Sequence, residues 1–202
     1  EYDSVLADNE GAAKEAVKRL TEAGHTKIGL IAGPQEIYTA SARNWGFQKA
    51  MMEAGLKLTD SMMVCGDYTI KGGARAMKQL HETHPDMTAV LISNYEMTVG
   101  AMIEINETGI RVPEELSIIG FDNLEFAKAI SPSLSIMTQP TRQMATAAVE
   151  LLLKRLDGDT DTSVQTVILP TEYVKGRSIK TIGAGCTDGK QGGTAHTMGG
   201  TT

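Results

Sequence analysis

The chain has 202 residues and a formal net charge of -6, and its composition is 41% hydrophobic and 22% charged. These values are typical of a globular domain and exclude a disordered or collagen-like chain. The apolar runs are far shorter than the roughly 20 residues of a membrane-spanning helix, and the acidic balance is opposite to that of a surface that binds nucleic-acid backbones. We therefore expect no membrane contact and no direct DNA binding by these residues.

The setting of the protein is expected to be cytoplasmic. The two cysteines, Cys65 and Cys186, lie far apart in sequence and belong to no CxxC pair, which fits a reducing compartment. The first residues lack both an initiator methionine and the basic and hydrophobic regions of a secretory signal. The sequence is thus expected to be part of a longer chain.

Apolar runs of strand length alternate with segments of helical periodicity along the first 121 residues. Strands are predicted at residues 5–7, 28–32, 62–65, 89–93 and 117–121, with helices over 11–23, 47–54, 73–80 and 96–107 between them. Parallel strands need long crossovers, which helices supply. The pattern predicts an α/β fold with a doubly wound, Rossmann-like parallel sheet covered on both faces.

The pattern changes after residue 121. A short helix at 125–130 precedes an extended segment between Pro132 and Pro140, which we expect to cross between two units. A helix with one apolar stripe and two short strands, 165–169 and 172–174, follow. The stripe consists of Ala145, Ala148, Val149, Leu152 and Leu156. The Gly- and Thr-rich residues 181–202 are predicted to form a flexible tail, since they offer little apolar surface to bury.

Polar and aromatic side chains follow the predicted strands where each strand ends. These residues are Thr39, Arg43, Tyr68, Asn94 and Asp122. Ligands of open α/β sheets bind beyond the carboxyl ends of the strands, so we expect a site for a small polar ligand there. Each residue has an alternative role, because Asn94 and Asp122 could cap helices, Arg43 could be a surface arginine and Tyr68 could seal the core.

Signatures of catalysis and of cofactor binding are missing from the sequence. It has no GxGxxG, HExxH or GxSxG motif, and no histidine follows a predicted strand. His81 and His84 have no evident third metal ligand. We expect a binding protein without enzyme activity, cofactor or metal.

Several stretches resemble the LacI family of bacterial transcriptional regulators. They include "RNWGFQKAMMEAGL", "GDYTIKGG", "RVPEELSIIGFDN" and "SPSLSIMTQP", in family order. The resemblance implies a periplasmic-binding-protein-like core of two lobes joined by three crossovers, with the effector between them. It assigns residues 9–139 and 162–180 to the C-terminal lobe and leaves 1–8 and 140–158 as remnants of the N-terminal lobe.

The resemblance also implies roles for single residues. Arg43 corresponds to the arginine that anchors the ligand, Asp122 to the carboxylate that accepts its hydroxyls, and Tyr68 to the stacking aromatic. Asn94 and Gln139 occupy further polar positions, and Thr39 occupies a variable one. The helix with Val99, Met102 and Ile103 resembles the dimerisation helix, although these residues could also form only its sheet-facing stripe. Tyr95 stands where the family usually has Asp.

By this resemblance the chain is the effector-binding core of a homodimeric, cytoplasmic repressor. The effector is a sugar or a similar small polar molecule, and operator DNA would be contacted only through a headpiece that this chain lacks. Two alternatives remain open from the sequence. One is a periplasmic sugar-binding protein of a transporter, and the other is a regulator controlled by a phosphocarrier protein.

Overall fold

The computed structural model describes residues 2–122, 124–157 and 163–183, and its largest element is a six-stranded sheet. The strand order is β3 (Met63–Cys65), β2 (Ile28–Ala32), β4 (Ala89–Ile92), β5 (Ser117–Phe121), β6 (Ser135–Thr138) and β8 (Glu172–Val174). The first five strands are parallel, and β8 runs antiparallel to β6. Every residue of β2, β4 and β5 is buried, which explains why these strands are continuous apolar runs.

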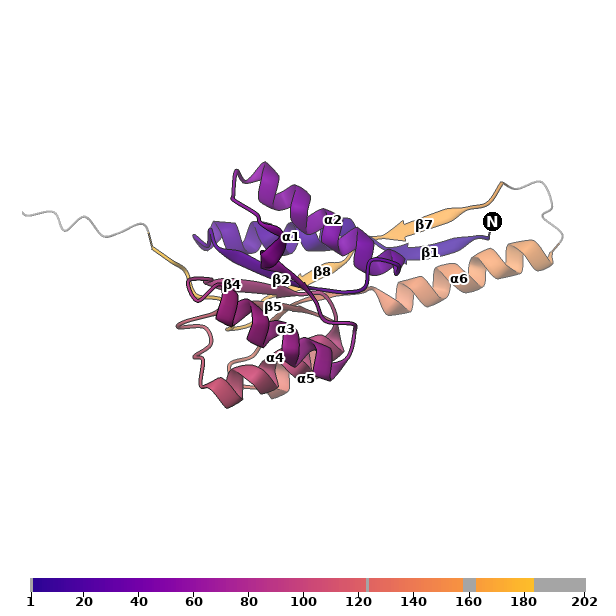
Figure 1. Ribbon diagram of the computed structural model, residues 1–202. Helices are drawn as coiled ribbons and strands as arrows, with labels where there is room; N and C mark the ends of the chain where they lie inside the picture. Colours follow the sequence, from indigo (N-terminus) through magenta and orange to yellow (C-terminus); the bar gives the residue numbers. More distant parts are fainter. Residues whose placement is uncertain (1, 123, 158–162, 184–202) are drawn as a thin grey trace, which may run out of the picture.

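Helices cover both faces of this sheet (Figure 1). On one face lie α1 (Asn9–Glu22) and α2 (Tyr38–Glu53), and on the other lie α3 (Ile70–Thr83), α4 (Tyr95–Thr108) and α5 (Leu124–Ala129). A 3-10 helix, η1 (Asp60–Met62), leads into β3. The prediction of a doubly wound α/β fold is therefore confirmed. None of the helices in the described ranges has the length and apolar character that a membrane span requires.

Helices α3 and α4 pack unusually closely because each has a glycine at their contact. A Cβ atom at Gly73 would lie 2.8 Å from the carbonyl carbon of Met97, and one at Gly100 would lie 2.8 Å from the backbone nitrogen of Ala74. Both distances are far below an ordinary carbon contact. The two glycines thus permit backbone-to-backbone approach and fix the position at which α4 begins.

A smaller unit stands beyond the carboxyl ends of the sheet strands. In it β1 (Ser4–Ala7) pairs in parallel with β7 (Thr166–Leu169), and α6 (Thr141–Leu156) packs alongside, as the right-hand part of Figure 1 shows. The sequence analysis assigned residues 162–180 to one lobe together with 9–139. The strand pairing divides that range, because β7 lies with β1 whereas β8 joins the six-stranded sheet.

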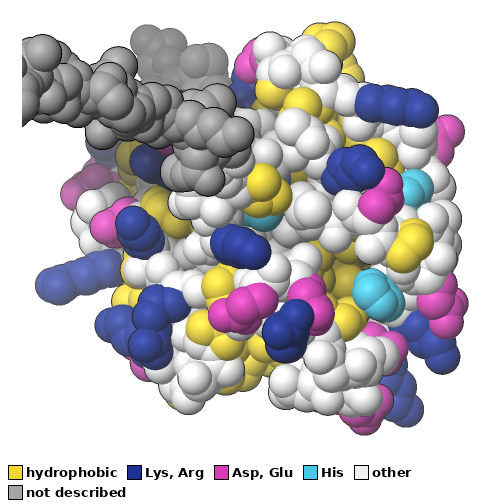
Figure 2. Space-filling view, turned by 90° about the vertical axis from the view of Figure 1, so that its left-hand side faces the viewer, with side chains coloured by type: hydrophobic (Ala, Val, Ile, Leu, Met, Phe, Trp, Pro, Cys, Tyr) yellow, Lys and Arg dark blue, Asp and Glu magenta, His cyan; other side chains and the backbone are white. Residues whose placement is uncertain are grey.

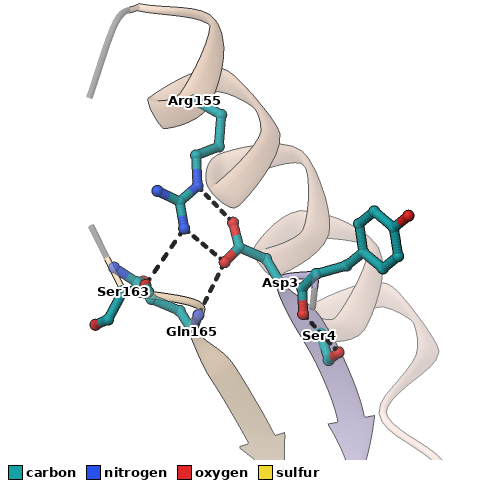
Figure 3. Close-up of polar contacts among 6 residues, drawn as sticks. Asp3, Ser4, Arg155, Ser163 and Gln165 are labelled. Atoms are coloured by element: carbon teal, nitrogen blue, oxygen red, sulfur yellow. Dashed lines mark hydrogen bonds and ion pairs between the residues drawn. The ribbon is translucent and has the colours of Figure 1, made fainter. Parts of the chain in front are cut away.

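One ion pair holds the three elements of the smaller unit together (Figure 3). Arg155 of α6 donates from Nε to Oδ2 of Asp3 at 2.8 Å and from Nη2 to Oδ1 at 2.7 Å. The same Oδ1 accepts a hydrogen bond from the backbone N–H of Gln165, just before β7. The hydrogen bonds from Arg155 and then from Gln165 lower the pKa of Asp3 to about 2, so the carboxylate stays charged.

The apolar stripe predicted for α6 is exposed. Leu152 and Leu156 have exposed fractions of 58% and 71%, and Val149 and Leu153 are exposed as well. The face that packs toward β1 instead contains Leu151, which is buried. Two strands and one helix form too small a layer to cover both sides of α6.

The chain returns to the amino-terminal edge of the six-stranded sheet after β8. There the ring of His25 contacts Thr88 Oγ1 through Nδ1 at 2.9 Å and the carbonyl oxygen of Lys180 through Nε2 at 3.0 Å. The backbone N–H of Ile182 donates to the carbonyl of Ala23 at 2.7 Å. Ile182, which falls in the predicted flexible tail of residues 181–202, is thus held in place, and residues 184–202 lie outside the described residues.

Candidate functional site

The polar side chains expected at the strand ends come together at one edge of the six-stranded sheet. Strands β2, β4 and β5 all point their carboxyl ends toward the unit of β1, β7 and α6 (Figure 1). Arg43 enters this edge from α2, Tyr68 from the loop after β3, Asp122 from the end of β5 and Gln139 from the segment before α6. The site is thus built from four separate parts of the sequence.

Arg43 is the central side chain of the site and is only 4% exposed. Its Nε donates to Asn9 Oδ1 at 2.8 Å, its Nη1 donates to the carbonyl oxygen of Ser93, and its guanidinium carbon lies 4.2 Å from the centroid of the Phe121 ring. Burial lowers the pKa of Arg43, and the nearby carboxylate of Asp122 opposes that shift. No hydrogen-bond partner for Nη2 exists among the described residues, so the N–H groups of Nη2 are available to a ligand.

Asp122 faces Arg43 with one oxygen already bound. Gln139 Nε2 donates to Asp122 Oδ1 at 2.8 Å, and the backbone N–H of Asp122 donates to the carbonyl of Met137 at 2.8 Å. These contacts hold Asp122 at a φ of 60°, in the left-handed region where Asp is tolerated better than most residues. Asp122 Oδ2 has no hydrogen-bond donor in the part of the chain that the structure describes, so it can accept one from a ligand.

Tyr68 lies in a tightly turned loop between β3 and α3. Both Asp67 and Tyr68 have positive φ angles, of 55° and 61°. The loop is held by the carboxylate of Asp67, which accepts from Thr69 Oγ1 at 2.6 Å and from Arg75 Nη2 at 2.9 Å. Positive φ at consecutive non-glycine residues persists only where the surroundings enforce it, and such positions cluster at ligand sites.

The other two expected contact residues are placed differently. Asn94 caps α4, since its Oδ1 accepts from the backbone N–H of Met97 at 3.0 Å and its Nδ2 donates to Glu96 Oε2 at 2.6 Å. The alternative role of a helix cap is therefore what the structure shows for Asn94. Thr39 is half-buried in the first turn of α2.

The three residues expected at a dimer interface have different environments on α4. Met102 is buried in the hydrophobic core with Ile105, on the stripe that faces the sheet. Val99 is half-buried and Ile103 is exposed. Tyr95, at the first position of α4, makes an edge-to-face contact with Phe126 at a centroid distance of 5.5 Å.

Residues outside the set predicted from the sequence complete the site. Asn9, in the first turn of α1, orients Arg43 with its side chain, while Asp8 is the cap of α1. Ser93 contributes its carbonyl oxygen and Phe121 its ring. Ser93 and Phe121 stand at the ends of predicted strands, so their positions in the chain could have indicated them.

The opposite, amino-terminal edge of the sheet has a different character. Figure 2 shows this face, on which Lys, Arg, Asp, Glu and His side chains alternate with hydrophobic ones. A hollow of about 400 Å³ there is lined by Lys27, Leu56, Met62, His84 and Met87 among others. His84 Nε2 contacts Ser61 Oγ at 3.0 Å, and within the described ranges no three His, Cys, Asp or Glu side chains are grouped as metal ligands.

The fold and the strand-end site define a ligand-binding α/β lobe. Residues 17–179 match the family model of the periplasmic binding protein-like domain. The chain belongs to this family, in the group found in LacI-type transcriptional regulators.

Two curated relatives and one solved structure show the likeness. The chain is 33% identical to the HTH-type transcriptional regulator CelR of Thermobifida fusca over 80% of its length and 47% of the relative's. It is 37% identical to the HTH-type transcriptional repressor CytR of Escherichia coli K12, over 78% and 46%. A structure of a CelR–cellobiose complex superposes with a TM-score of 0.83 at 32% identity, covering 88% of this chain and 54% of that one. The chain thus spans about half the length of these relatives.

Proposed function

We propose that this chain is the effector-binding core of a LacI-type repressor and that its effector is a sugar or a similar polyhydroxylated molecule. The observation that supports the proposal is the convergence of Arg43, Asp122 and Tyr68 at the sheet edge that faces the smaller unit. An arginine fork donates, a carboxylate accepts, and an aromatic face covers C–H surface, which together suit a small molecule with many hydroxyls.

The chemistry of the site favours binding over catalysis. Arg43 and Asp122 are oriented by Asn9 and Gln139, and among the residues that the structure describes neither is hydrogen-bonded to a histidine or to a nucleophile paired with a base. The name of the solved CelR complex states that CelR binds cellobiose, a sugar. By this argument the chain is not an enzyme and needs no metal or cofactor.

The two-part structure suggests how binding acts on the rest of the regulator. The chain crosses between the six-stranded sheet and the smaller unit after β1, before α6 and between β7 and β8. In the proposal the sheet with residues 9–139 and 172–180 is one lobe, and β1, α6 and β7 belong to the other. A ligand that contacts both lobes favours one of their relative arrangements.

The remaining features of the proposal come from the relatives. Their names identify them as HTH-type regulators, so operator DNA would be bound by a segment that this chain does not contain, inside the cytoplasm. A homodimer would form in part through Val99 and Ile103, which are the members of the expected interface that reach the surface of α4.

Thermal unfolding with a ligand panel tests the proposal. The panel contains cellobiose, D-glucose, D-ribose, D-glucose 6-phosphate and guanine. A ligand at 100 times its Kd stabilises the folded state by about 2.7 kcal/mol, which raises the Tm by roughly 5 to 10 °C for a domain of this size. We expect such a shift with one sugar and its loss in Asp122→Asn.

The control is Asp60→Asn, since Asp60 is exposed in η1 at the other edge of the sheet. This variant should bind like the wild type. An absence of any shift with the whole panel, or an equal shift in Asp122→Asn, would contradict the proposed effector site.

A further inference from the structure

Two side-chain atoms near the site are buried without a hydrogen-bond partner. They are Asn44 Oδ1 and Tyr68 Oη, and the described residues contain no other buried side-chain nitrogen or oxygen of this kind. A buried polar atom without a partner loses its contact with water and gains nothing in return. Such atoms are rare in folded proteins, and two that occur close together call for a common explanation.

Both atoms belong to residues that contact Gly33, directly after β2. The Tyr68 ring lies so close to Gly33 that an added Cβ atom would be 2.7 Å from Oη and nearer still to Cε1 and Cζ. Asn44 Nδ2 lies 3.5 Å from the carbonyl oxygen of the same Gly33, which is at the limit of a hydrogen bond. The Asn44 carboxamide is therefore held only weakly by the protein.

The same position adjoins the centre of the effector site. Asn44 follows Arg43 in α2, and the phenol of Tyr68 is near enough to Arg43 to oppose the lowering of that arginine's pKa by burial. Asn44 is 1% exposed and lies on the face of α2 that also buries Phe47 and Met51. An apolar side chain at this position would fill the space without leaving a polar atom unsatisfied.

The two atoms have complementary chemistry. Tyr68 Oη can donate a hydrogen bond and Asn44 Oδ1 can only accept one, so a single alcohol that accepts from the first and donates to the second satisfies both. Tyr68 shares its loop with Asp67, and the two positive φ angles of these residues mark a conformation that is held from outside.

We infer that Asn44 and Tyr68 together form a hydroxyl-recognition point of the effector site, so that Asn44 determines specificity for a ligand with an alcohol next to Gly33. The inference rests on the proposed function. The recognition point adds a further contact to those of Arg43 and Asp122. A ligand with a C–H group in place of the alcohol leaves both buried polar atoms without a partner, so it binds much more weakly.

The first test measures the thermal stability of the ligand-free protein. Its two variants each remove a polar atom and change the side-chain volume little. Tyr68→Phe deletes only the hydroxyl, and Asn44→Leu replaces the carboxamide with an apolar side chain of similar size. We expect each to raise the Tm of the free protein by roughly 2 to 4 °C, since an unsatisfied polar atom is removed. A lower Tm in both variants would show that these atoms already have partners, such as a bridging water, and would overturn the inference.

The second test is affinity, measured by calorimetry with whichever of cellobiose, D-glucose and D-ribose binds the wild type. We expect the Kd to rise about tenfold or more in each variant and to rise no further in the double variant, because one alcohol contacts both residues. One monodeoxy derivative of that sugar, the one that lacks the shared alcohol, should bind the wild type more weakly than the parent sugar does. Asn44→Leu should bind this derivative no more weakly than it binds the parent sugar. Asn106→Leu, at an exposed position of α4, is the matched control and should leave the Kd unchanged.

The outcomes separate the two proposals. If the wild type binds a sugar and Asp122→Asn abolishes binding, while Asn44→Leu and Tyr68→Phe bind like the wild type, only the hydroxyl-recognition point is overturned. A loss of affinity in just one of these two variants also overturns it, since the shared alcohol is then absent. If the wild type binds none of the three sugars, the proposed function and this inference both fail.

Discussion

Replacing Gly33 by alanine places a methyl group where the Tyr68 ring now lies. The new Cβ would be 2.7 Å from Tyr68 Oη and closer to two ring carbons, whereas carbon atoms pack well at about 3.5 to 4.0 Å. The ring must therefore move by about 1 Å or more, which typically costs about 1 to 3 kcal/mol. Gly33 is not among the glycines with positive φ, so alanine adds no backbone strain there.

The expected net effect follows from two opposing contributions. The overpacking cost is reduced by about 0.4 to 1 kcal/mol, because alanine restricts the unfolded chain more than glycine does. We therefore expect a loss of about 0 to 2.6 kcal/mol with a middle value of about 1.3 kcal/mol, seen as a Tm that is lower by up to roughly 10 °C. The effector should also bind more weakly, since Tyr68 no longer lies in its position.

A double-mutant cycle by thermal and chemical unfolding provides the decisive measurement. In a Tyr68→Ala background the obstacle is gone, so Gly33→Ala should be neutral or slightly stabilising there, which gives an interaction energy of about 1 to 3 kcal/mol. Gly183→Ala is the control, because no atom of the residues that the structure describes lies within 4 Å of the position of its Cβ. An equal cost of Gly33→Ala in both backgrounds would refute the reasoning.

Three further predictions concern other parts of the fold. Burial is the main cause that lowers the pKa of His25 below its ordinary value of 6.5, so the unfolded chain binds a proton before the folded one. The Tm of the wild type should therefore fall as the pH drops from 7.5 through 6.5 to 5, and His25→Asn should remove that part of the slope; parallel slopes would contradict this. Asn94→Ala should lower the stability by about 1 kcal/mol through loss of the α4 cap, while Asn94→Ser, which can still accept from the backbone, should retain most of the stability. Leu151→Ala should cost about 2 kcal/mol or more and Leu156→Ala less than about 0.5, which urea unfolding can distinguish; equal costs would show that α6 packs by its other face.

The fold could be predicted from local sequence signals because its central strands are buried on both faces. Residues 28–32, 89–92 and 117–121 are short apolar runs. Two helices and the short strand β3 separate the first from the second, and one helix separates the second from the third, a pattern with few other solutions. The packing of α6 could not be predicted in this way. Helical periodicity identifies an apolar stripe but says nothing about what covers it, and the stripe with Leu152 is exposed.

Part of the candidate site could be proposed from the sequence for an equally physical reason. Arg43 and Asp122 carry groups whose chemistry suggests a ligand, and they follow β2 and β5, whose carboxyl ends lie at one edge of the sheet. Asn44 and Gly33 gave no such signal, because an asparagine inside a helix and a glycine after a strand are common. Only the structure shows that Asn44 Oδ1 is buried without a partner and that the Tyr68 ring lies close against Gly33.

The pairing of β1 with β7 has a consequence for the order in which the protein assembles. The carboxylate of Asp3 and the backbone N–H of Gln165, which it accepts, are 162 residues apart. At a synthesis rate of 5 to 20 residues per second, β1 leaves the ribosome about 8 to 32 seconds before its partner strand exists. During that interval the five parallel strands β2 to β6 are synthesised and can pair, while β1 has no partner strand. The pairing of β1 with β7 and the addition of β8 to the sheet are therefore expected to be the last steps, and residues 4–7 stay unpaired longest.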